Sequence, residues 1–234
     1  MNRICKLSAI ALLASSTSLM AQSKSFEGVS LGLSVSAIGV EVAGSTTNNT
    51  TSTSSGSLGK VAEIAAIDLS YGYAIGPNGI IQVGASYTPG KAKAGSGTFT
   101  DGSTVSPGND NTSKINLEVK DPYNIYIAPT YVISKDSAIY AKVGYAKADV
   151  NTTATGSASL SKKPNDLEGW TYGIGSKTML TPNLYLGIEA SITDYDEVTA
   201  TTVAGTDAGS STNTKNIKAD VKTAQGIITL GYKF

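Results

Sequence analysis

The sequence predicts an all-β fold in which eight antiparallel strands run up and down and close into a barrel. Apolar residues recur at every second position in eight separate runs, which is the period of a strand with two different faces. The connections between successive runs alternate between short turns and long polar segments. Beyond residue 21, no run has the helical period or the length of a membrane-spanning helix.

The composition excludes several classes of function. The 234 residues carry 18 Lys and Arg against 18 Asp and Glu, and no His. A neutral chain without a basic tract has no electrostatic footprint for nucleic acid, so we expect no such partner. Without imidazole there is no Ser-His-Asp or Cys-His catalysis and no His-based zinc site. We therefore expect no cofactor, no metal and no catalytic residue. The chain has 12 Tyr against 3 Phe, which indicates a surface where aromatic rings contact apolar surroundings while their hydroxyl groups reach water.

Residues 1–21 have the features of a cleaved secretory signal peptide, and we expect residues 22–234 to form the barrel domain. Arg3 and Lys6 precede a run of apolar and small residues, and Ala21 is a small residue at the cleavage position. The alternative, a membrane anchor, needs about 20 continuous apolar residues, and Ser and Thr interrupt this run. The only cysteine, Cys5, lies in the same segment, so the exported chain has no thiol.

The first three strands are predicted at 29–37, 67–75 and 81–87. From Val29 to Ala37 the odd positions are apolar and the even positions are Ser or Gly. One face of such a strand meets apolar surroundings and the other presents small polar groups. Gly76-Pro77-Asn78-Gly79 is turn chemistry between the second and third strands.

The other five strands are predicted at 115–133, 139–145, 169–177, 184–192 and 228–234, with short turns at 134–137 and 181–183. Pro122 and Pro129 fall within the fourth strand. Because proline lacks the N–H that a ladder needs, we expect a bulge or a ladder break there.

Long segments follow the first, third, fifth and seventh strands, at 43–59, 89–113, 151–166 and 197–215. They are dominated by Ser, Thr, Asn, Gly and Asp, so we expect loops. Short turns at one end and long loops at the other are typical of a bacterial outer-membrane barrel. The strands average roughly 15 residues, whereas about 9–11 span a bilayer. We therefore expect them to project beyond the outer leaflet, with Glu63 and Lys120 in this aqueous extension.

Aromatic residues fall at two heights along the predicted strands, as expected for two girdles at the lipid headgroups. The set near the short turns is Tyr73, Tyr131, Tyr232 and Phe234, and the upper set is Tyr87, Tyr123, Tyr145, Trp170 and Tyr172.

Three motifs carry a family resemblance. The ending Ile228-x-Leu230-x-Tyr232-x-Phe234 resembles the C-terminal signal that the barrel-assembly machinery recognises in outer-membrane proteins. The runs 169–175 and 28–33 resemble strands of the eight-stranded OmpA-like and opacity-protein barrels. The resemblance covers residues 22–234 and implies an integral outer-membrane protein with lipid and lipopolysaccharide as partners, three short periplasmic turns and four long extracellular loops. It implies architecture more than activity, because that superfamily includes anchors, adhesins, weak pores and resistance factors.

Four charged residues face inward by the alternation: Asp68, Lys142, Lys177 and Glu189. The interior of an eight-stranded barrel is just wide enough for side chains, so inward charges must neutralise one another. We expect a buried ionic cluster with Tyr126, Gln82 and Gln225 as hydrogen-bonding neighbours. Its favoured role is a plug that fixes strand register, and the alternative is a gated conductance or proton path.

The favoured function is a non-enzymatic envelope-structural or surface-interaction role through the extracellular loops, with a surface ligand that the sequence does not identify. The alternative is a small, low-conductance, porin-like pore. An outer-membrane enzyme is a third class, but the resemblance implies barrel enzymes that depend on histidine, and this chain has none. A soluble lipocalin-like carrier would reverse the alternation, with apolar residues inside.

Overall fold

The computed structural model describes residues 22–48, 53–100, 112–155, 158–162, 166–204 and 214–234. Residues 1–21, and with them the predicted signal peptide, lie outside the described residues. A 3-10 helix, η1 (Ser23–Phe26), precedes the sheet. The eight barrel strands are β1 (Gly28–Asn48), β2 (Thr53–Ala74), β3 (Gly79–Tyr87), β5 (Thr112–Ser134), β6 (Ser137–Thr155), β8 (Leu167–Met179), β9 (Leu184–Tyr195) and β11 (Thr214–Lys233). Three further strands are β4 (Lys91–Thr100), β7 (Ala158–Lys162) and β10 (Val198–Ala204).

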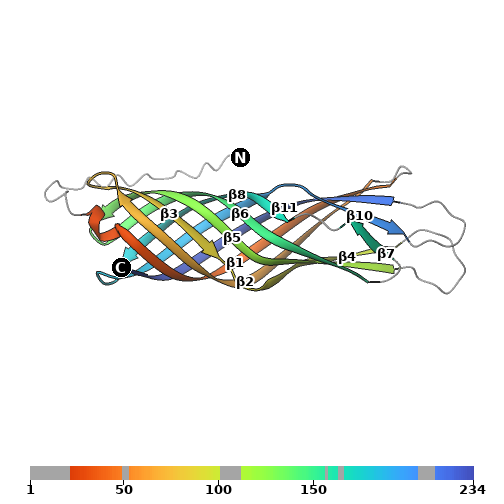
Figure 1. Ribbon diagram of the computed structural model, residues 1–234, viewed down its shortest axis with the longest axis horizontal. Helices are drawn as coiled ribbons and strands as arrows, with labels where there is room; N and C mark the ends of the chain where they lie inside the picture. The colour runs from red at the N-terminus through yellow and green to blue at the C-terminus, as the bar shows by residue number, and fades with distance from the viewer. Residues whose placement is uncertain (1–21, 49–52, 101–111, 156–157, 163–165, 205–213) are drawn as a thin grey trace, which may run out of the picture.

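The eight barrel strands pair antiparallel in the order β1-β2-β3-β5-β6-β8-β9-β11, and β11 closes the barrel on β1 (Figure 1). The closing ladder is long, running from Ser30 opposite Lys233 to Asn48 opposite Lys215. Phe234 donates its backbone N–H to the Val29 carbonyl at 2.9 Å, so the last residue also joins the closing strand pair. The predicted fold class, a closed eight-stranded antiparallel barrel, is confirmed. Within the described ranges, no helix is long and apolar enough to cross a membrane.

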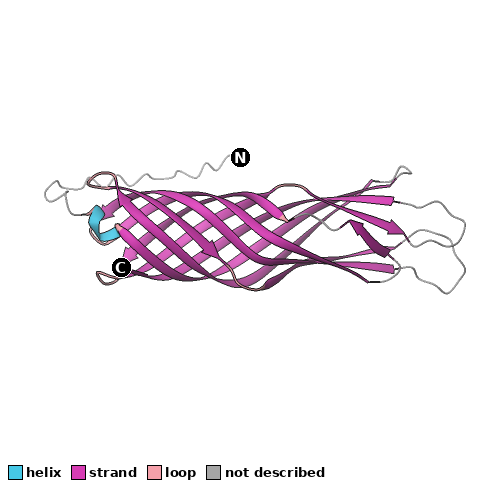
Figure 2. Cartoon of the chain, viewed as in Figure 1, coloured by secondary structure: helices cyan, strands magenta, loops and turns pink. Residues whose placement is uncertain are grey.

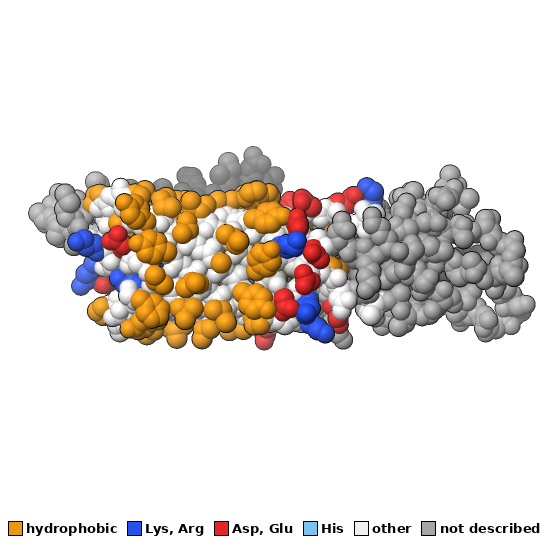
Figure 3. Space-filling model, in the orientation of Figure 1, with side chains coloured by type: hydrophobic (Ala, Val, Ile, Leu, Met, Phe, Trp, Pro, Cys, Tyr) orange, Lys and Arg blue, Asp and Glu red, His pale blue; other side chains and the backbone are white. Residues whose placement is uncertain are grey.

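The two faces of the wall differ as the alternation predicts. Large apolar side chains point outward and stay exposed, with Leu33 at 64% and Ile174 at 68%. Small polar residues such as Ser30 and Ser70 point inward and are buried. Figure 3 shows the outward apolar side chains as a broad band bordered by charged residues. So large an apolar surface is tolerated in lipid and not in water, and its direction contradicts the lipocalin-like alternative.

The expectation that 43–59, 89–113, 151–166 and 197–215 are loops is wrong for much of their described length. β1 continues to Asn48 and β2 begins at Thr53, while β4, β7 and β10 lie wholly within such segments (Figure 2). Thr is β-branched and favours strands. Because the strands below are already in register, each further pair adds ladder hydrogen bonds at little additional loop-closure cost. The sheet therefore continues well beyond the apolar band.

Both prolines of the fourth predicted strand interrupt the ladder between β5 and β6, as expected. The register shifts between Lys120 and Tyr123, on either side of Pro122. The pairing also omits Ala128 and Pro129, and resumes at Thr130 in an unchanged register. Pro122 therefore marks a bulge, whereas Pro129 marks a local break.

Three tyrosines inside the barrel lie over glycines directly opposite them on the neighbouring strand. The pairs are Tyr126 with Gly84, Tyr140 with Gly175, and Tyr185 with Gly231. A Cβ atom added at Gly175 would lie 2.5 Å from Cζ of Tyr140. Since the interior of such a barrel holds little more than its side chains, these glycines make the room that the rings occupy.

Substituting Gly175→Ala should lower the free energy of unfolding by about 1–3 kcal/mol, because Tyr140 must leave its position. The matched control is Gly226→Ala, since a Cβ there has nothing within 4 Å. The measurement is the urea midpoint of the protein refolded into vesicles, followed by gel mobility without boiling. Equal midpoints for the two variants would contradict the steric argument.

Candidate functional site

The barrel encloses a cavity of about 410 Å³. All four predicted lumen charges line it, as do the three expected neighbours Tyr126, Gln82 and Gln225. These side chains come from seven different strands, so the closed sheet and its alternation bring them together.

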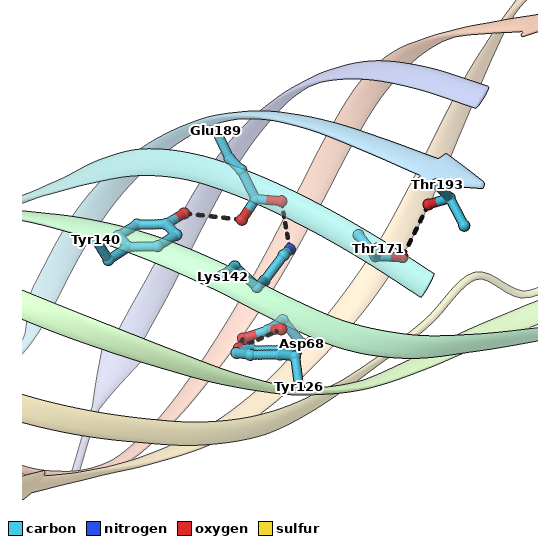
Figure 4. Close-up of polar contacts among 7 residues, drawn as sticks. All are labelled: Asp68, Tyr126, Tyr140, Lys142, Thr171, Glu189 and Thr193. Atoms are coloured by element: carbon cyan, nitrogen blue, oxygen red, sulfur yellow. Dashed lines mark hydrogen bonds and ion pairs between the residues drawn. The ribbon is translucent and has the colours of Figure 1, made fainter. Parts of the chain in front are cut away.

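At the centre of the cavity Lys142 and Glu189 form an ion pair between β6 and β9 (Figure 4). Only 9% of each side chain is exposed. The Tyr140 hydroxyl donates to the second carboxylate oxygen of Glu189 at 2.9 Å. Nζ of Lys142 also lies 5.0 Å from the ring centroid of Tyr126, within cation–π range. The pair is thus held by contacts on both partners.

Asp68 and Lys177 find neutral partners. The Tyr126 hydroxyl donates to the two oxygens of Asp68 at 3.0 and 2.9 Å. Lys177 donates to Oε1 of Gln82 at 2.8 Å and lies 4.9 Å from the centroid of the Tyr185 ring. The structure therefore gives the four charges one direct ion pair and two neutral hydrogen-bonded contacts, and a single ionic cluster of all four stays a prediction.

Sequence reasoning missed the lumen roles of Tyr140 and Tyr185. Tyr140 anchors Glu189, and Tyr185 covers both Gly231 and Lys177. It also missed the hydrogen bond of 2.8 Å between the buried hydroxyls of Thr171 and Thr193. The signal was present, because all four residues occupy inward positions of the alternation.

The periplasmic end of the lumen is closed by apolar side chains. Ile80, Val132 and Ala138 are buried together, and Phe26 of η1 packs against them. The Ser23 N–H donates to the Pro77 carbonyl at 3.2 Å, which fastens η1 to the first short turn. The space left at this end is about 10 Å³, no more than one water molecule needs.

The outer end of the lumen is apolar as well. Ala148, Leu167, Val198 and Val221 are buried together. They come from β6, β8, β10 and β11, and partly buried residues of β1, β5 and β9 pack against them. An apolar layer contributed from so many strands lies across the barrel. The polar middle of the lumen therefore sits between two apolar layers.

The nine predicted girdle residues all point outward and are exposed: Tyr73, Tyr87, Tyr123, Tyr131, Tyr145, Trp170, Tyr172, Tyr232 and Phe234. Two edge-to-face pairs join them, Tyr145 with Trp170 at 5.8 Å and Tyr232 with Phe234 at 5.1 Å between centroids. Ile228 and Leu230 of the C-terminal motif also face outward. Contact of these rings with lipid headgroups stays a prediction.

A belt of charged residues follows the upper aromatic set. Lys147 lies 2.7 Å from Glu168 and 3.6 Å from Asp166. Two exposed pairs continue the belt, Lys218 with Glu197 at 2.6 Å and Lys222 with Asp194 at 3.4 Å. The hydrogen bond from Lys147 holds the pKa of Glu168 below its ordinary value of 4.5. In the part of the chain that the structure describes, no three His, Cys, Asp or Glu side chains are grouped to hold a metal ion.

Breaking the buried pair should be costly. Glu189→Gln leaves the Lys142 ammonium buried without a counter-charge, so the free energy of unfolding should fall by about 3–5 kcal/mol. The double variant Lys142→Met/Glu189→Gln should recover much of that loss, because neither position then leaves a charge without its counter-charge. Asp194→Asn, which breaks an exposed pair, is the control and should change the urea midpoint little. Equal losses for Glu189→Gln and Asp194→Asn would show that the buried pair has no special role.

The Glu168 carboxylate should make stability depend on pH. Because its pKa is lowered in the folded protein, its contribution is present above the ordinary pKa and is lost as the pH falls through the lowered value. The difference in urea midpoint between wild type and Glu168→Gln should therefore shrink between about pH 7 and about pH 3. A constant difference for Glu168→Gln would refute the coupling.

A family model described as an outer membrane protein beta-barrel domain matches residues 9–234. No curated protein matches the sequence. Among solved structures, the outer membrane protein OprG from Pseudomonas aeruginosa is 13% identical, with 87% of this chain and 96% of that chain covered and a TM-score of 0.49. The outer membrane protease OmpT from Escherichia coli is 10% identical, with 88% and 96% covered and a TM-score of 0.53.

The attachment invasion locus protein Ail of Yersinia pestis is 13% identical, with 89% of this chain and 99% of that chain covered and a TM-score of 0.41. At such identities a structural likeness shows the fold alone, whereas the family model covers nearly the whole chain. The chain therefore belongs to the outer membrane protein beta-barrel domain family, and it is a protein of the bacterial outer membrane.

Proposed function

We propose that the protein has a non-enzymatic role in the cell envelope, either structural or in surface interaction through the part of the barrel above the outer leaflet. One observation carries this proposal: Phe26, Ile80, Val132 and Ala138 fill the periplasmic end of the lumen, so the described residues leave no open axial route there. The sheet continues beyond the upper aromatic residues, so much of the described chain above them is strand and not loop.

The absence of histidine supports a role without catalysis. The chain contains no imidazole, and the lumen carboxylates are engaged by Lys142, Tyr140 and Tyr126. A general acid or base must lie within hydrogen-bonding distance of the substrate. These carboxylates are instead hydrogen-bonded to side chains of the barrel. The likeness to a protease of the outer membrane concerns the fold alone.

The proposed partners are outer-membrane lipid, lipopolysaccharide and the barrel-assembly machinery. The outward apolar band suits acyl chains, and the cations Lys147, Lys218 and Lys222 lie in the belt just above it. Lipopolysaccharide phosphates would lie at this level. Recognition of the C-terminal motif by the assembly machinery would use Phe234, which is 70% exposed.

A small diffusion pore is the second candidate, and the cavity of about 410 Å³ is the observation that favours it. Ions would still have to pass the periplasmic end, where about 10 Å³ is free. Conduction therefore needs a movement of η1 or of the apolar layer around Ile80.

Planar-bilayer recordings of the refolded protein should show no discrete conductance steps. The double variant Phe26→Ala/Ile80→Ala should produce steps, because it removes the two largest side chains of the periplasmic layer. Leu33→Ala, on the lipid face, is the matched control and should stay silent. Steps from the wild type that change with Lys142→Met would favour the pore and overturn the closed-lumen proposal.

A further inference from the structure

The cavity meets an apolar layer at each axial end, and on one side of the wall its lining includes exposed residues. We infer that a portal between β2 and the β3–β4 connection admits an uncharged, mainly apolar molecule with one hydroxyl group from the outer leaflet into the lumen. This inference does not rest on the proposed surface role, because it concerns the interior of the barrel.

The hydrogen-bonded wall is interrupted on one side of β2. Its pairing with β3 ends at Ile67 opposite Tyr87. Above that point, residues 53–66 of β2 pair with β1 alone among the described strands. β4 in turn pairs with β5 alone in the described chain. The upper half of β2 and the start of β4 are therefore neighbours without a ladder between them.

At this seam the residues that line the cavity include exposed residues of the wall as well as buried ones. Buried lumen residues such as Glu189 line the cavity, and so do exposed residues of the seam such as Ala65, Pro89 and Lys91. A second, apolar groove of about 360 Å³ lies on the lipid side. The two spaces share four lining residues: Ser34, Ala65, Ala66 and Pro89. The inner cavity and the outer groove therefore lie on either side of the same few residues, next to the seam.

The β3–β4 connection, residues 88–90, lies beside the seam and is hydrogen-bonded to β5. Thr88 donates its N–H to the Pro122 carbonyl, and Asp121 donates its N–H to the Gly90 carbonyl, both at 2.9 Å. The Asp121 carboxylate also accepts the Gly90 N–H at 3.0 Å. Asp121 has a φ of 48° and Gly90 a φ of 113°, both left-handed. The left-handed conformation is costly for Asp121, whereas glycine adopts it readily. The connection is bound to β5 and leaves Pro89, which has no N–H, beside β2.

The height of the seam indicates where a ligand would come from. Tyr87 and Tyr123 of the upper aromatic set border it, and the groove below is lined by Leu33, Val35 and Leu230. A molecule dissolved in the outer leaflet would reach the portal by moving along this apolar groove.

The lumen chemistry selects an uncharged molecule. Its two acids and two bases balance, so a charged guest would bring an unmatched charge into a buried site. The upper cavity is apolar near the seam, with Ile38, Val40 and Ile64 in its lining. The hydroxyls of Tyr185 and Thr223 are buried in the same lining without a hydrogen-bond partner in the described structure. A hydroxyl group on the guest would satisfy one of them, and its apolar body would cover the aliphatic side chains.

Photo-crosslinking of the full chain in outer-membrane vesicles tests the portal. The probe is octanol carrying a diazirine, and mass spectrometry locates the labelled residues. Wild type should be labelled at lumen residues such as Ile38 and Ile64 as well as on the lipid face. Unlabelled octanol should compete for the lumen sites, whereas octyl sulfate should not. Labelling confined to the lipid face, or equal competition by the sulfate, would overturn the inference.

The variant Ala66→Trp places a large ring on the inward side of the seam and should abolish lumen labelling while lipid-face labelling persists. Ala85→Trp, which points outward on β3, is the matched control and should keep both. Persistent lipid-face labelling and the mobility shift on boiling report that each variant is folded. Unchanged lumen labelling in Ala66→Trp would also overturn the inference, and the competition experiment decides the question if that variant fails to fold.

Discussion

The closing ladder between β1 and β11 is the constraint on which the rest of the structure depends. Hydrocarbon offers no water to a free N–H or C=O group, so a sheet that spans a bilayer must leave no unpaired edge at that depth. The long register from Ser30 to Asn48 meets this requirement, and Phe234 completes it at the periplasmic rim. Once the sheet is closed, the alternation along each strand sorts every side chain to the lipid or to the lumen.

The narrow lumen then decides which inward residues are tolerated. Three rings fit only because glycine stands opposite each of them, as with Tyr140 and Gly175. The charges are tolerated because each has a partner, whether an opposite charge, as for Lys142 and Glu189, or a neutral group, as for Lys177 and Gln82. Such a buried pair adds little to stability relative to apolar side chains of the same shape, but losing one partner is costly. That such a pair fixes strand register in this barrel stays a prediction.

Much of the fold could be predicted from the sequence because period two is a local property. The inward direction of Asp68 and Glu189 follows from their neighbours alone, and the ladder breaks follow from the missing N–H of Pro122 and Pro129. The partners of each charge could not be predicted, because they depend on how far each strand is displaced along the next around the barrel. The polar segments were misassigned because Ser and Thr suit both loops and strands, and only a partner already in register decides between them. The seam was hidden for the same reason: it arises where β3 ends and β2 does not.

The position of the seam follows from the same constraint as the closure. Residues 53–66 of β2 have no ladder partner among the described strands on the side away from β1, and unpaired backbone groups would be prohibitively costly in the hydrocarbon. At the level of Tyr87 and above, water and lipid headgroups can hydrate them. The paired part of β2 and β3, from Ile67 to Ala74, covers the depth at which hydration is impossible. A lateral opening in a small closed barrel can therefore form only at the upper boundary of the apolar band. At that level the hydroxyl group of an amphiphile stays hydrated until the molecule enters the lumen.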